Sequence, residues 1–260
     1  MTPEMLKKRI HTLYNQYNRR EYVHPDPLEF LYLYKEIRDR EIVGLIASSL
    51  AYGRVKQILN SVSFVLDKMR PSPYVFITQS SYRSFCKAFE GFTHRFATGE
   101  HLAGLLWGIK NVIARFGSLN NCFCHGVSSD DDTVIPAMIF FTGQLITGAG
   151  NPGHLVPLPE KGSACKRMNL FLRWMVRKDN VDPGGWKNVP LSKLVIPLDT
   201  HMHKISLKLG LTLKKQANMN TALEITSYFK QIVPDDPVKY DFVLTRLGIR
   251  DDMNNNLICP

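Results

Sequence analysis

The sequence lacks any long hydrophobic run. It has 260 residues, and its most apolar stretch, residues 134–146, is too short to cross a bilayer as a helix. The first sixteen residues, MTPEMLKKRIHTLYNQ, contain no apolar segment of the kind that directs secretion. These absences predict a cytoplasmic protein without a membrane partner. Its 44% hydrophobic and 22% charged residues are typical of a globular fold.

Cysteine is also scarce. The five cysteines, an odd number at irregular spacing, do not make the paired framework of a disulfide-rich secreted domain. Cys122, Cys124 and His125 lie close together, but no second group of ligands completes a tetrahedral metal site. The sequence therefore predicts free thiols in a reducing compartment, with no metal and no other cofactor.

Acidic residues are few beside the basic ones. The chain has 33 Lys and Arg against 23 Asp and Glu, a net charge of +10. Residues 161–215 alone contain 12 Lys and Arg and only three Asp, so most of the excess lies in this segment. Such a segment favours a polyanion such as nucleic acid, although a basic enzyme with scattered lysines has the same composition.

Hydrophobic periodicity is helical almost throughout, and alternating strand patterns are scarce. Asp26, Pro27 and Glu29 have the cap, proline and acidic residue of a helix start. We expect about ten helices, among them residues 42–52, 55–69, 100–116, 134–147, 163–178, 200–210, 219–233 and 237–247. The prediction is an all-α protein with two helical lobes around a central cleft. One lobe would contain residues 1–45 and 212–260, and the other residues 46–211.

The segment around Asp199 has the pattern of an N-capped helix. The string IPLDTH (residues 196–201) ends an extended run at a proline, and Asp199 then caps the following helix. A plain cap would account for Asp199 alone. The longer string IPLDTHMHKISLKLGL, however, resembles the Pro-Val-Asp-Thr-His-Val-x-Arg-x-x-x-Arg-Leu block of the helix-hairpin-helix (HhH-GPD) superfamily of DNA base-excision glycosylases. In that family the aspartate is the catalytic carboxylate, so the resemblance implies this role for Asp199.

A second region of resemblance lies upstream. LPEKGSACK (residues 158–166) is similar to the family hairpin Leu-Pro-Gly-Val-Gly-x-x-Thr-Ala, with Glu160 at the first glycine, where a carboxylate repels a DNA phosphate. The following helix and its long separation from Asp199 are nearest to the archaeal 8-oxoguanine glycosylase branch. The resemblance implies that Lys166 is the nucleophile, with Lys161 as the alternative.

The position of Lys166 on its helix supports a nucleophilic role. With Ser163 as the cap, Lys166 would lie in the first turn, whose positive end disfavours an ammonium charge. An amine must be neutral to attack a carbon. Asn169, Arg173 and Arg177 recur on the same helical face, and the alternative interpretation of that face is a solvated basic surface.

The resemblance also implies contacts with double-stranded DNA and with an extruded base. Residues expected at the DNA are Lys161, Gly162, Arg167, Arg173, His201, Lys204 and Lys208. Residues expected around the base are Leu50, Tyr52, Tyr240, Asp241 and Phe242. The family has Gln or Asn near Leu50 and Tyr52, so an apolar side chain would replace a polar one; a core helix there, and a surface Asp at Asp241, are the alternatives. An iron–sulfur cluster held by four C-terminal cysteines is not expected, because only Cys259 follows Asp199.

The resemblance therefore implies a DNA repair enzyme of the nucleoid. It would be a glycosylase with AP lyase activity on an oxidised purine such as 8-oxoguanine, and it would need no obligate protein partner. Three alternatives remain: a monofunctional glycosylase that uses Asp199 and water, a non-catalytic nucleic-acid-binding protein of the same fold, and a helical protein unrelated to DNA.

Overall fold

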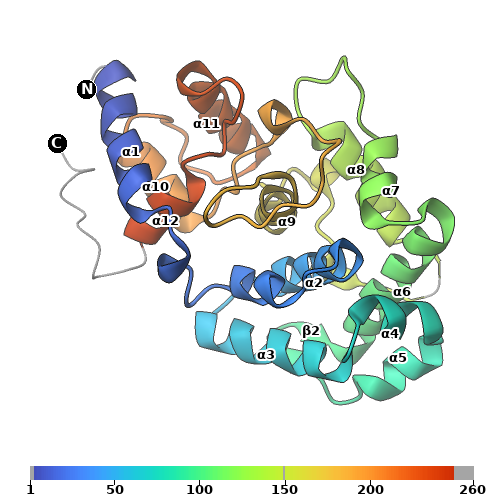
Figure 1. Cartoon of the computed structure of the whole chain (residues 1–260). Helices are drawn as coiled ribbons and strands as arrows, with labels where there is room; N and C mark the ends of the chain where they lie inside the picture. The colour runs from blue at the N-terminus through green and yellow to red at the C-terminus, as the bar shows by residue number, and fades with distance from the viewer. Residues whose placement is uncertain (1–2, 149, 249–260) are drawn as a thin grey trace. The chain divides into compact units, whose positions relative to one another are not determined.

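The computed structural model describes residues 3–148 and 150–248, which are mostly helical (Figure 1). The α-helices are α1 (Pro3–Tyr17), α2 (Ile37–Ser49), α3 (Val55–Lys68), α4 (Pro73–Gln79), α5 (Tyr82–Ala88), α6 (Gly99–Phe116), α7 (Leu119–His125), α8 (Ile135–Leu145), α9 (Lys166–Val176), α10 (Thr200–Lys208), α11 (Met219–Ile232) and α12 (Asp241–Leu247). Short 3-10 helices are η1 (Arg20–Tyr22), η2 (Pro27–Leu33), η3 (Gly153–Leu155), η4 (Pro159–Lys161) and η5 (Leu191–Lys193). Strands β1 (Thr93–His94) and β2 (Ala97–Thr98) pair antiparallel. The predicted all-α class is confirmed.

The contacts of the chain divide it into two units. The terminal unit contains residues 3–24, 132–134 and 159–248, and the middle unit contains residues 25–131 and 135–158. Residues 3–24 and 159–248 thus belong to one unit. The boundaries differ from the predicted ones, because residues 159–211 group with the chain ends and residues 25–45 group with the middle of the chain.

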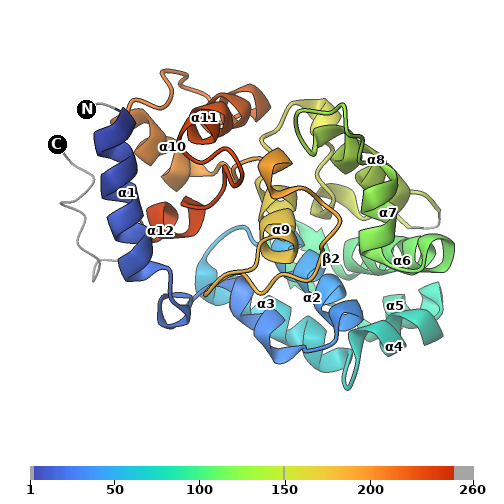
Figure 2. The same ribbon diagram turned by 45° about the horizontal axis from the view of Figure 1, so that its top comes forward.

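The terminal unit is built from α1 and α9 to α12. Helix α12 contacts both α1 and α10, and α1 also contacts α11 (Figure 1, Figure 2). The apolar face of α1 is buried at Leu6, Ile10 and Leu13, which explains the helical spacing of these residues. Because α12 contacts α10, this packing supports the helix that Asp199 caps.

The middle unit is arranged around α6, which contacts α4, α5, α7 and α8. Two glycines of α6 allow a close backbone approach: a Cβ at Gly104 would lie 2.7 Å from the backbone of Asn151, and one at Gly108 would lie 2.0 Å from the Leu145 carbonyl oxygen. The short β1–β2 hairpin joins α5 to α6. Helix α2 is buried over residues 41–49, as the core-helix interpretation of this segment required.

Most predicted helices are present, and most of them are shorter than predicted, whereas α2 covers residues 37–49 rather than 42–52. The segment at Pro27 begins with the predicted cap, since Asp26 accepts a hydrogen bond from Leu28 N (2.8 Å), but it is a 3-10 helix. Helix α12 begins at Asp241 rather than at Pro237. Within residues 3–148 and 150–248, no helix combines the length and the apolar character that crossing a membrane would need.

Candidate active site

Lys166 and Asp199 form an ion pair. Lys166 Nζ lies 3.1 Å from Asp199 Oδ2, and the two side chains are 35% and 15% exposed. Asp199 caps α10 as predicted, because its other oxygen, Oδ1, accepts hydrogen bonds from the backbone N–H groups of His201 (2.9 Å) and Met202 (2.8 Å). The carboxylate is therefore fixed by the helix end, and one oxygen is left to face the amine.

Lys166 is the first residue of α9, whereas the predicted cap at Ser163 would have made it the third. Ser163 does not cap the helix: it forms an isolated β-bridge with Asn218, and Cys165 follows in a left-handed conformation with φ +45°. This reversal of the chain starts the helix at residue 166 rather than at 164. The ion pair therefore joins the first residue of α9 to the N-cap residue of α10, both in the terminal unit.

The basic face of α9 beyond Lys166 is buried, so its interpretation as a solvated surface is wrong. Arg173 is 3% exposed and pairs with Asp182 (3.2 Å) and with Asp241. Arg177 pairs with Asp179 (2.9 Å), Asp182 and Asp236 (3.0 Å). These two arginines and four carboxylates, which we call the buried ion network, lock α9 against the segments that follow it.

The buried ion network perturbs several ionisable groups. Burial alone would raise the pKa of Asp179, but the Arg177 charge and two backbone N–H groups outweigh it and lower this pKa to about 2. Burial, and then the carboxylates of Asp199 and Asp182, raise the pKa of Asp241 to about 6 against the opposing charge of Arg173. Asp241 Oδ1 is buried without a hydrogen-bond partner. Asp241 is thus a buried network residue and not a surface carboxylate.

The five residues predicted to surround a base are mostly buried. Leu50 is fully buried at the end of α2, and Tyr240, Asp241 and Phe242 are 1–3% exposed. The partly exposed Tyr52 donates a hydrogen bond to the backbone oxygen of His94 (2.9 Å). Four of the five residues are therefore buried in this structure, and Tyr52 is partly exposed.

Most of the residues predicted to contact DNA are on the surface. Lys161, Gly162, His201, Lys204 and Lys208 are exposed, and Arg167 is partly exposed. Arg173 is the exception: its burial and its two carboxylate partners do not fit a phosphate contact. The exposed cations come from η4, α9 and α10, which all belong to the terminal unit.

Lys214 and Lys215 were missed, although they belong to the same basic segment. They line a concavity of about 420 Å³ with Gln216, Asn218, Asn220 and Thr221. The Met219 N–H donates to the Gly162 carbonyl (3.2 Å), which joins this loop to the predicted hairpin. The positive charge of residues 161–215 could have indicated these two lysines, but neither belongs to a motif that resembles the glycosylase family.

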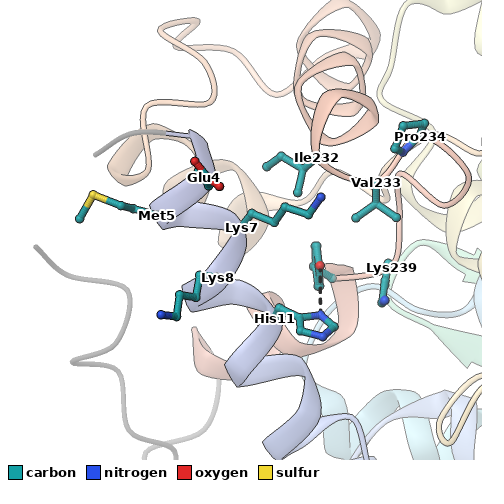
Figure 3. Close-up of a pocket in the computed structure, with 10 residues that line it drawn as sticks. Glu4, Met5, Lys7, Lys8, His11, Ile232, Val233, Pro234 and Lys239 are labelled. Carbon is teal, nitrogen blue, oxygen red and sulfur yellow. Dashed lines mark hydrogen bonds between the residues drawn. The ribbon is translucent and has the colours of Figure 1, made fainter.

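A larger pocket, of about 740 Å³, lies between α1 and the segment from α11 to α12 (Figure 3). Its lining residues are Glu4, Met5, Lys7, Lys8, His11, Ile232, Val233, Pro234, Lys239 and Tyr240. Tyr240 is the one predicted site residue among them. Lys239 Nζ lies 4.9 Å from the Tyr14 ring and 5.8 Å from the Tyr240 ring, so its charge is already placed over aromatic faces.

A family model matches residues 26–250, which include Lys166, Asp199 and the buried ion network. The chain belongs to the family described as protein of unknown function (DUF2400). Searches of curated proteins and of solved structures found no match.

The DUF2400 chain shows no cluster of three or more His, Cys, Asp or Glu side chains that could hold a metal, as far as residues 3–148 and 150–248 are concerned. Cys122 and Cys124 are free thiols, and burial raises the pKa of Cys122 to about 12. Cys259 lies outside the described residues.

Proposed function

We propose that this protein is a DNA glycosylase with AP lyase activity on an oxidised purine such as 8-oxoguanine. The observation that carries the proposal is the 3.1 Å contact between a part-exposed primary amine and a carboxylate that caps a helix. An amine and an acid in contact are the groups that imine chemistry at a sugar carbon requires. The HhH-GPD fold is part of the same proposal, since it rests on the resemblance at residues 158–166 and 196–211.

The proposed reaction assigns one step to each group. Lys166 transfers a proton to Asp199 Oδ2, and its lone pair then attacks C1′ of the damaged nucleotide. The bond from C1′ to the base breaks, and the base leaves with the bonding electrons and takes up a proton. The second N–H proton is taken up by O4′ as the C1′–O4′ bond breaks and the sugar ring opens, which gives a protonated imine. Loss of a C2′ proton then forms the C2′–C3′ double bond and expels the 3′ phosphate with the electrons of the C3′–O bond.

The surrounding charges support this division of roles. Asp199 accepts two backbone hydrogen bonds through Oδ1, which hold its other oxygen, Oδ2, beside the Lys166 amine. The exposed lysines at positions 161, 204 and 208 are available for phosphates, and the buried ion network holds α9 rigid behind the amine. The nucleophile is thus held on a rigid element rather than on a loop.

Borohydride trapping tests the lyase step. A duplex with one 8-oxoguanine, incubated with the protein and sodium borohydride, should give a covalent cross-link, and Lys166→Ala should abolish it. Lys187→Ala is the matched control, because Lys187 is an exposed lysine of the same unit to which the proposal gives no role. No cross-link with any oxidised purine, or an unchanged yield in Lys166→Ala, would remove the lyase.

Asp199→Asn tests the carboxylate separately. Asparagine still accepts hydrogen bonds at a helix cap, so the fold should persist. Base release should fall by at least about 100-fold, the lower range for a lost acid–base group. Base release that persists in Lys166→Ala but not in Asp199→Asn would indicate the monofunctional alternative.

One observation favours a second candidate, a non-catalytic nucleic-acid-binding protein. Glu160 is exposed on η4, at the point where the resemblance has a glycine whose backbone faces a phosphate. Binding with a steep salt dependence, together with no product from a panel of lesions, would support this candidate over the enzyme.

A further inference from the structure

The β1–β2 turn presents an aromatic side chain to solvent. Phe96 is 73% exposed at the tip of the two-residue turn, and the Arg95 guanidinium lies over its ring, 5.5 Å from the centroid. Arg95 has φ +53°, a left-handed conformation that is unusual for a residue with a side chain. Because Phe96 is largely exposed, its side chain contributes little hydrophobic stabilisation, and other residues must hold the turn in place.

A hydrogen-bonded cluster inside the middle unit holds the base of the turn. The ring of His94 is fully buried, with Nδ1 2.9 Å from Ser61 Oγ and Nε2 3.1 Å from the Tyr52 carbonyl. Tyr52 Oη donates to the His94 carbonyl (2.9 Å), and His154 Nε2 lies 2.8 Å from Tyr52 Oη. Because the Tyr52 proton is used toward His94, His154 Nε2–H is the donor in the last contact.

The two side chains at the tip are positioned by their neighbours. The Arg95 side chain crosses Gly53, where a Cβ would lie 2.7 Å from Arg95 Cδ and where φ is +97°. The Phe96 ring meets the His154 ring edge to face, with the centroids 6.4 Å apart. Arg95 therefore covers one face of the Phe96 ring and His154 contacts the ring edge to face, while most of the Phe96 side chain remains exposed.

The charge of the three segments around the tip has one sign. Residues 52–66, 91–99 and 151–159 contain no Asp or Glu, and they include Arg54, Lys56, Arg95 and His154. The nearest acidic residues along the second segment are Glu90 and Glu100, which flank it. A guanidinium beside an exposed ring, in cationic surroundings, matches a ligand that has both phosphates and flat π-systems.

We propose that Arg95 and Phe96 form a contact for an unpaired base of nucleic acid, with Phe96 stacking on the base and Arg95 facing the adjoining phosphate. The inference rests on the proposed function only for the class of ligand, because it uses no residue of the Lys166–Asp199 pair. An unpaired base exposes the π-face that stacking needs, whereas a base inside a fully paired duplex does not.

Fluorescence anisotropy with a labelled 20-nucleotide single strand of mixed sequence, and with the corresponding duplex, tests the proposal. Phe96→Ala should weaken single-strand binding by about 10-fold, within the range measured for one lost stacking contact. Binding of the paired duplex should change by less than about 2-fold. Leu33→Ala is the matched control, since Leu33 is 72% exposed in the same unit; it should bind like the wild type.

A tryptophan at position 96 gives a second readout. Phe96→Trp should keep the wild-type affinity, which shows that the hairpin is folded, and the added fluorescence should be quenched by the single strand. Leu33→Trp should not be quenched. Equal single-strand affinity of Phe96→Ala and wild type, an equal loss on duplex and single strand, or no quenching of Phe96→Trp would each overturn the proposal.

The outcomes separate this proposal from the proposed function. Anisotropy needs no chemistry, so it is measured in the Lys166→Ala background as well. Stacking at Phe96 without any borohydride cross-link would leave this contact standing and remove the lyase. A normal cross-link together with wild-type binding by Phe96→Ala would support the lyase and overturn the proposed contact at Phe96.

Discussion

Asp179 shows how much one residue depends on distant partners. It accepts hydrogen bonds from Tyr14 Oη (2.9 Å) and from the backbone N–H groups of Val181 and Asp182 (2.8 Å each), and it pairs with Arg177. Tyr14 belongs to α1, 165 residues away in the sequence. The ionised form of Asp179 is thus tied to two separate parts of the terminal unit.

This dependence predicts an acid-sensitive contribution to stability. Since the folded pKa of about 2 is below the value near 3.8 in an unfolded chain, the contribution is present above pH 4 and is lost as the pH falls to 2. Asp179→Asn should therefore cost about 2 kcal/mol at pH 7 and much less at pH 2. Urea unfolding from pH 2 to 7 measures this, with the exposed Asp235→Asn as control; a pH-independent loss would contradict the prediction.

Single residues differed in how well the sequence predicted them. Asp199 was predicted correctly as a cap because capping is local: a proline, an acidic residue and the following helical period lie within six residues. Arg173 was not, because its partners Asp182 and Asp241 are nine and 68 residues away. Periodicity identifies the face of a helix on which a charge lies, but only tertiary contacts decide whether that face is buried.

At the scale of elements, α10 combines a structural and a proposed chemical role in one side chain. Asp199→Ala removes the cap and should lower the free energy of unfolding by about 1–2 kcal/mol. Asp199→Asn keeps a hydrogen-bond acceptor and should lower it by only about a few tenths of a kcal/mol. Thermal unfolding should place the Ala variant several degrees below the Asn variant, at roughly 2–4 °C per kcal/mol for a chain of this size. Equal melting temperatures of the two variants would show that capping does not stabilise α10.

The elements themselves were mostly predictable where the helices are long and amphipathic. Helices α3, α6 and α11 start or end within one or two residues of the predicted ranges. The short helices α4, α5 and α7, each of seven residues, were not named, because two turns give too few periodic positions. The start of α9 was missed because a left-handed residue, Cys165, and a β-bridge at Ser163 replace the expected cap.

At the scale of the whole molecule, the excess of positive charge is concentrated in the terminal unit. If exposed lysines there contact phosphates, duplex affinity should fall steeply with salt, and each lost contact should reduce the slope of log K against log salt by about 0.9. Lys204→Ala and Lys208→Ala should each have this effect. Lys35→Ala, an exposed lysine of the middle unit, should leave the slope unchanged; equal slopes in all variants would place the duplex elsewhere.

The bond from Tyr14 to Asp179 has a practical consequence for anyone preparing this protein in part. The family match starts at residue 26, yet α1 precedes it and supplies both this hydroxyl and the buried Leu6, Ile10 and Leu13. A fragment cut at that boundary would expose the apolar residues that pack against α1 and would leave Asp179 without the Tyr14 hydroxyl. The segment that matches the family model is therefore shorter than the segment that completes the core of the terminal unit.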